Sequence, residues 1–243
     1  MHGYQDVNNK LPAGWVTKSG GPYPSPGYSW QTLILPYVEQ QALLTAINPD
    51  LTTPGGPPAT PVTNSVLLNP VPVYTCPSDA GQPLAANFNN YARTNYLANR
   101  FVLGPDVSNN PTTLSVQTIS DGSSNTILAG ERDATTNVGG SALIRHNNSS
   151  CSFEARFGRG LNPKPAAGTV WTNANDQRLA YASNHTGGAN FLFGDGSVRF
   201  LANSLECDPA ENWTTFPHAA GYAFGYVGQR LEVPNDNFPV NLP

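Results

Sequence analysis

The chain has 243 residues, of which 12% are charged, and a formal net charge of −4 at pH 7. With only 12 Lys and Arg residues, it lacks the basic surface that nucleic-acid binding requires, so no nucleic-acid partner is expected. No stretch reaches the roughly 18 consecutive apolar residues of a membrane span. Turn-forming residues are abundant, including 23 Gly and 23 Pro, and they predict a loop-rich protein with little regular helix.

The first regular element that the sequence predicts is a helix over residues 29–47. Ser29 is a suitable N-cap, and apolar residues recur at helical spacing from Trp30 to Leu44. Pro36 interrupts this pattern and is expected to kink the helix or to begin a second one. The apolar stripe indicates a face that packs against a sheet.

The rest of the sequence suggests one domain over residues 1–243 with three irregular segments. Residues 1–28 are predicted to be an extended, turn-rich lead-in, because Gly and Pro cluster there. Residues 49–63 are Pro-rich and are expected to form a surface loop. Residues 208–243 are predicted to be an irregular tail.

The strongest strand signal lies near the C-terminal end. Two apolar runs, Ala189–Phe193 and Val198–Leu201, flank a Gly-Asp-Gly-Ser turn, which is typical of a β-hairpin. Residues 124–132 also alternate as a strand. Together with the helix, these elements predict an α+β fold in which a helix covers an antiparallel sheet.

The same region carries a family resemblance. His185 precedes Asp195-Gly196 with nine residues between them, and three further stretches accompany this spacing. In these stretches the chain resembles a planctomycete-type prepilin-like family, described as a domain of unknown function with a prepilin-type N-terminus and a C-terminal His-x9-Asp-Gly motif. The three stretches are Tyr28–Gln41, Tyr74–Asp79 and Ile119–Glu131.

This resemblance implies a pilin-like head with long insertions, from which the N-terminal pilin helix is absent. The implied protein is a structural subunit of a type IV pilus or pseudopilus, acting in surface filament assembly, adhesion or secretion, and not an enzyme. Its partners would be copies of itself or other pilin-like subunits, held through a helix preceding Met1, which would also be its only link to a membrane. Its expected location is extracellular or at the cell surface.

His185 and Asp195 permit two interpretations. As a functional pair they would be a general base and an orienting carboxylate. As structural residues, Asp195 would bind backbone N–H groups of its own turn, with Gly196 supplying the turn geometry, and His185 would bind a loop. Because no Gly-x-Ser-x-Gly nucleophile elbow is present, we favour the structural interpretation and predict no catalytic residue.

An alternative function is a secreted carbohydrate- or calcium-binding module, with hydrolytic activity as one form of it. Asp121, Asn125 and Glu131 could supply oxygen ligands, so calcium is the candidate cofactor. Aromatic residues, including Trp15, Trp171 and Trp213, could stack on sugar rings, although such residues usually belong to a core.

Three cysteines, Cys76, Cys151 and Cys207, occur without a Cys-x-x-Cys pair, which argues against a zinc site of the usual spacing. Outside the cytoplasm one disulfide is expected. We favour Cys151–Cys207, because Cys76 lies in one of the family-like stretches.

Overall fold

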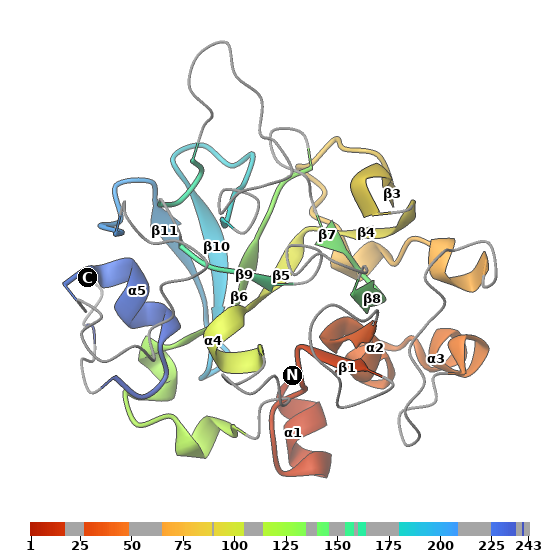
Figure 1. Cartoon of the computed structure of the whole chain (residues 1–243), viewed down its shortest axis with the longest axis horizontal. Helices are drawn as coiled ribbons and strands as arrows, with labels where there is room; N and C mark the ends of the chain where they lie inside the picture. Colours follow the sequence, from red (N-terminus) through yellow and green to blue (C-terminus); the bar gives the residue numbers. More distant parts are fainter. Residues whose placement is uncertain are drawn as a thin grey trace.

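The structure, a computed structural model, combines short helices with small, mainly antiparallel sheets (Figure 1). It describes residues 1–17, 27–48, 65–88, 90–104, 114–134, 140–145, 154–157, 160–163, 180–208, 225–236 and 240. The strands are β1 (Trp15–Thr17), β2 (Gly27–Ser29), β3 (Leu84–Ala85), β4 (Tyr91–Thr94), β5 (Tyr96–Asn99), β6 (Ile127–Glu131), β7 (Gly140–Ser141), β8 (Ile144–Arg145), β9 (Glu154–Ala155), β10 (Gly188–Phe193) and β11 (Val198–Ala202). The α-helices are α1 (His2–Asn8), α2 (Trp30–Ile34), α3 (Gln41–Ile47), α4 (Arg100–Leu103) and α5 (Val227–Glu232). The 3-10 turns are η1 (Leu35–Val38), η3 (Ser65–Leu68), η4 (Pro72–Tyr74), η5 (Ala86–Phe88), η6 (Val116–Thr118) and η7 (Ser123–Asn125).

A five-stranded sheet in the order β11-β10-β6-β5-β9 is the largest sheet of the described residues. Its strands pair antiparallel except for β5 and β9, which run parallel. The predicted hairpin and the predicted strand over 124–132 are both present, as β10–β11 and β6, and they are neighbours. Two three-stranded sheets, β1-β2-β8 and β3-β4-β7, complete the described strands. The predicted α+β class is therefore confirmed.

The predicted helix over 29–47 is interrupted at Pro36, as the sequence predicts, but it forms three short pieces and not one helix over the whole range. Pro36 lies in η1, and Glu39 ends that turn in the left-handed region with φ 61°, after which α3 begins. Ser29 does precede α2, but its hydroxyl donates to the carbonyl oxygen of Ala142 at 2.5 Å instead of capping the helix. The tertiary contact thus replaces the expected local one.

Two of the predicted irregular segments contain helices. The lead-in over 1–28 begins with α1, and the tail over 208–243 contains α5. The Pro-rich segment 49–63 lies outside the described residues. In the described part of the chain, no helix has both the length and the apolar character needed to span a bilayer.

Two apolar clusters lie around the central sheet. One includes the side chains of α2 and β8, and the other is built around an aromatic trio, Phe157, Tyr181 and Phe191, with ring centroids 5.0–5.3 Å apart. Alternating residues of β10 point into this second cluster, as the period of a strand requires. The hairpin and α5 lie at one end of the molecule, and α2 and α3 lie at the other (Figure 1).

The close packing of the aromatic trio on β6 gives a test of the fold. A Cβ atom added to Gly130 would lie 2.5 Å from ring carbons of Phe191 and 2.7 Å from Tyr181. Gly130→Ala should therefore lower the free energy of unfolding by about 1–3 kcal/mol, measured by denaturant titration. Gly225→Ala is the matched control, because nothing lies within 4 Å of its added Cβ, and it should change stability by less than about 0.5 kcal/mol. Equal stabilities for the two variants would contradict this packing.

Candidate functional site

Asp195 belongs to the hairpin turn and has no contact with His185. Its Oδ1 accepts from the backbone N–H of Ser197 at 2.9 Å and from the Ser197 hydroxyl at 2.6 Å, and its Oδ2 lies 3.4 Å from Arg199. The Ser197 hydroxyl, chiefly, holds the pKa of this carboxyl below its usual range. Gly196 completes the turn with φ 85°. Asp195 and Gly196 thus act within their own turn, and no base–carboxylate pair with His185 forms.

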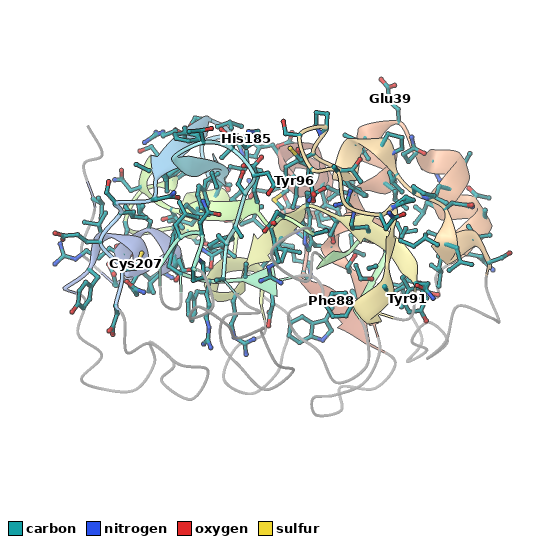
Figure 2. All side chains as sticks on the ribbon, turned by 90° about the horizontal axis from the view of Figure 1, so that it is seen from above. Glu39, Phe88, Tyr91, Tyr96, His185 and Cys207 are labelled. Atoms are coloured by element: carbon teal, nitrogen blue, oxygen red, sulfur yellow. The ribbon has the colours of Figure 1, made fainter. Side chains whose placement is uncertain are left out.

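His185 instead meets two side chains from distant parts of the chain. Its Nε2 lies 3.2 Å from Oε1 of Glu131 and 3.7 Å from Sγ of Cys76. These three ligand-capable atoms all lie within 4.8 Å of one another, and we call them the Cys76–Glu131–His185 cluster. Glu131 is buried, whereas the His185 side chain is 29% exposed and lies near an edge of the molecule in Figure 2.

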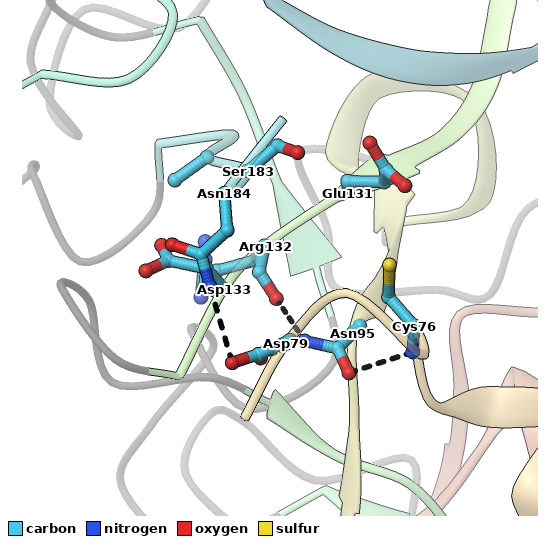
Figure 3. Close-up of a pocket in the computed structure, with 9 residues that line it drawn as sticks. Cys76, Asp79, Asn95, Glu131, Arg132, Asp133, Ser183 and Asn184 are labelled. Carbon is cyan, nitrogen blue, oxygen red and sulfur yellow. Dashed lines mark hydrogen bonds between the residues drawn. The ribbon is translucent and has the colours of Figure 1, made fainter. Parts of the chain in front are cut away.

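The elements around the cluster hold each of its side chains in place. Glu131 ends β6, and its second carboxylate oxygen accepts from the backbone N–H of Asn190 on β10 at 2.7 Å. The backbone N–H of Cys76 donates to Oδ1 of Asn95 at 2.9 Å, and in Figure 3 the Cys76 sulfur points toward the Glu131 carboxylate. The backbone N–H of His185 donates to the Ser183 hydroxyl at 3.0 Å. The cluster is therefore preorganised by hydrogen bonds to neighbouring strands and loops.

Sequence reasoning did not group these three residues. Cys76, Glu131 and His185 lie in three of the four stretches that carry the family resemblance, one residue in each. That distribution was the available signal, because each of these stretches offers a side chain able to bind a proton or a metal. The predicted calcium set contained only oxygen ligands and therefore did not include the Cys76 thiol.

The predicted calcium ligands do not come together. Asp121 and Asn125 precede β6, whereas Glu131 is its last residue, so the strand separates them by roughly 13 Å at ~3.3 Å per residue. Asp121 accepts from the backbone N–H of Asp236 at 2.8 Å, and the Asn125 side chain donates to the Asp121 carbonyl at 3.1 Å. Asp121 thus ties the turn before β6 to the C-terminal segment, and Asn125 fastens that turn, so these two residues make contacts of their own away from Glu131.

A second polar centre lies next to the cluster, around Asp79 (Figure 3). Its carboxylate is buried and accepts from the guanidinium of Arg93, the side-chain amide of Asn95 and the backbone N–H groups of Gly81 and Ala134. Burial by itself would raise the pKa of Asp79, but the hydrogen bonds from Asn95, Gly81 and Ala134 and the charge of Arg93 together lower it. The Cys-Pro-Ser-Asp stretch thus supplies a thiol to one centre and a carboxylate to the other.

An apolar groove adjoins the cluster on the same side of the central sheet. Its volume is about 220 Å³, and its lining is almost entirely apolar. It is lined by Met1, Trp30, Ile34, Val73, Tyr74, Tyr96, Ala129, Gly130, Asn190, Phe191, Leu192 and Val198. Tyr96, which lines the groove, is the cross-strand partner of Glu131, so the groove reaches the cluster at this pair.

Other predicted features lie partly outside the described residues. Cys151 is outside them, so the Cys151–Cys207 disulfide stays a prediction. Trp171 and Trp213 are also outside them, whereas Trp15 is buried, with 8% of its surface exposed. Trp15 therefore belongs to the core and presents no sugar-binding surface.

The fold and the site define a loop-rich α+β protein in which an antiparallel sheet gathers three distant stretches around one polar cluster. The chain belongs to the family described as "Protein of unknown function (DUF1559)", whose model matches residues 1–208. No curated protein and no solved structure matches the chain. The matched residues include every stretch on which the family resemblance was based, and membership of the family carries no assigned activity.

The Asp79 centre gives a pH-dependent prediction. Asp79→Asn should lower the free energy of unfolding by about 3 kcal/mol at pH 7, because it leaves the buried Arg93 guanidinium without its anionic partner. The lowered pKa of Asp79 means that its stabilisation is present above the ordinary value of 3.8 and is lost as pH falls through the folded-state value. The stability difference between wild type and variant, measured in urea from pH 7 down to pH 3, should therefore shrink below about pH 3.8.

Asp195→Asn is the matched control for this experiment. Its carboxylate is more exposed and pairs within its own turn, so the change should cost less than about 1 kcal/mol at pH 7. If Asp79→Asn lowers the free energy of unfolding no more than Asp195→Asn does, the buried network around Asp79 contributes little to stability.

Proposed function

We propose that this chain is the globular head of a pilin-like or pseudopilin-like structural subunit. In this proposal an apolar helix preceding Met1 anchors the subunit in the membrane and then packs between subunits of a filament. The subunit is exported, is displayed at the cell surface, and acts in filament assembly, adhesion or secretion. The proposal is supported chiefly by an open apolar sheet face beside the start of α1.

This open face belongs to the β10–β11 hairpin. Val198 is 66% exposed and Phe200 is 50% exposed, and their cross-strand partners Leu192 and Asn190 point to the same side. On the opposite side of the hairpin, Ala189, Phe191, Phe193 and Leu201 are buried in the aromatic cluster. Exposed apolar side chains grouped in this way mark a surface that another apolar element covers.

The position of α1 relates this face to the N-terminal end of the chain. Nε2 of His2 lies 2.8 Å from the carbonyl oxygen of Gly194 in the hairpin turn, so α1 starts against the hairpin. Met1 lines the groove, so α1 starts beside an apolar surface. A helix that continued α1 in the N-terminal direction would therefore begin at the groove.

The groove suits a helix better than a small ligand. Its volume of about 220 Å³ is below the range of about 300–1,000 Å³ that is usual for small-molecule pockets. Its lining is almost entirely apolar, as a surface that packs against the apolar face of a helix requires. The low charge of the chain, 12%, also suits a surface that lies against copies of itself without repulsion.

Assembly of the natural gene product tests this proposal. The chain would be expressed with its natural upstream residues in cells that have an assembly machinery, and filaments or membrane-anchored protein would be measured by electron microscopy and fractionation. Val198→Asn combined with Phe200→Asn should leave the fold intact but reduce assembly. Loss of two buried apolar contacts costs about 3 kcal/mol, or roughly 100-fold in association.

Val7→Asn is the matched control, because Val7 is 69% exposed and does not line the groove. It should assemble like the wild type. Wild-type assembly by the double variant, or no assembled or anchored form of the unmodified gene product, would refute the proposal.

A further inference from the structure

We propose that Cys76, Glu131 and His185 bind one divalent transition-metal ion of the zinc type. This inference is separate from the proposed assembly function, and neither depends on the other. It rests on the positions of the three ligand atoms, on their chemical types, and on the hydrogen bond that orients the Glu131 carboxylate.

The distances fit a tetrahedral metal site. Bonds of about 2.3 Å from zinc to sulfur and about 2.0–2.1 Å from zinc to nitrogen, at a tetrahedral angle, place sulfur and nitrogen about 3.6 Å apart. The same geometry places nitrogen and a carboxylate oxygen about 3.4 Å apart. The observed separations are 3.7 Å from Cys76 Sγ to His185 Nε2 and 3.2 Å from that nitrogen to Glu131 Oε1. The third pair, Cys76 Sγ and the Glu131 carboxylate oxygen, lies within 4.8 Å. Small side-chain rotations therefore let a single ion contact all three atoms without a change of fold.

Proton balance also favours a cation over a catalytic triad. A triad uses both ring nitrogens of histidine, one toward the nucleophile and the other toward the carboxylate. In this cluster the same atom, Nε2 of His185, faces both Cys76 and Glu131. One nitrogen cannot at once accept a proton from the thiol and donate a proton to the carboxylate. A metal ion satisfies all three groups together, because it takes a thiolate, a carboxylate and a nitrogen lone pair.

The Glu131 carboxylate has an outer hydrogen bond of the kind that orients metal ligands. The Glu131 oxygen that faces away from the cluster accepts from the Asn190 backbone N–H, which leaves Oε1 directed at His185. Such contacts fix ligand orientation and strengthen metal binding. A small pocket with room for about one water molecule borders Cys76 and Glu131.

The ligand types indicate which metal ion the site prefers and how binding would affect stability. A thiolate and an imidazole favour zinc and its neighbours over calcium or magnesium, which prefer oxygen ligands. Three protein ligands leave a fourth position for water or for a group from a partner. Glu131 and Cys76 lie 54 and 109 residues from His185 in the sequence, so the ion would join three distant segments. Its binding would therefore stabilise the folded state.

Metal titration tests the site directly. Protein stripped with a chelator and kept reduced would be titrated with Co²⁺, followed by absorption, and with Zn²⁺, followed by calorimetry. We expect one ion per chain, a sulfur-to-cobalt charge-transfer band, and a melting temperature raised by about 5 °C or more at saturating zinc. Cys76→Ser and His185→Gln should each lower zinc affinity by about 100-fold or more, with circular dichroism confirming that the variants are folded.

Cys207→Ser is the matched thiol control and should keep both the affinity and the charge-transfer band. Since His185 is partly exposed, His185→Gln should fold even if Cys76→Ser does not. The zinc affinity of His185→Gln is then sufficient to test the metal site. The proposal is overturned if the wild type does not bind either ion stoichiometrically, or if folded His185→Gln binds zinc as tightly as the wild type.

Discussion

The antiparallel pairing of β6 with β10 is the interaction on which the rest of this structure depends. It aligns Phe191 with Gly130, where the absence of a side chain lets the aromatic ring lie on the strand. It also brings the backbone N–H of Asn190 to the carboxylate of Glu131. A buried carboxylate is costly unless hydrogen bonds compensate it, so the core and the polar cluster share one structural support.

This pairing gives the sheet two different faces. One face is closed by the aromatic cluster around Phe157, and the other carries the apolar groove and the exposed hairpin residues Val198 and Phe200. The groove and the metal-ligand cluster meet at Asn190 and Tyr96, which lie beside both. A protein element bound in the groove would therefore lie next to the proposed metal ion, and its side chains could reach the open fourth position.

The motif residues divide into two kinds by their contacts. The carboxylate oxygens of Asp195 and Asp79 accept hydrogen bonds that hold a turn and a buried loop, respectively. Cys76 and His185 have side chains that converge on Glu131 from separate loops. Asp195 and Asp79 therefore have a structural role, whereas Cys76, His185 and Glu131 are the motif residues whose side chains are arranged to bind a ligand.

The sequence by itself determined the α+β class, the β10–β11 hairpin and the β6 strand, because alternation and a Gly-Asp-Gly-Ser turn act over a few residues. It also marked the stretches that hold Cys76, Glu131 and His185. Only the tertiary structure decided that these three residues meet and that the Ser29 hydroxyl binds the carbonyl of Ala142 instead of capping a helix. Both outcomes depend on contacts between residues that lie 54 to 113 positions apart in the sequence, which no local pattern encodes.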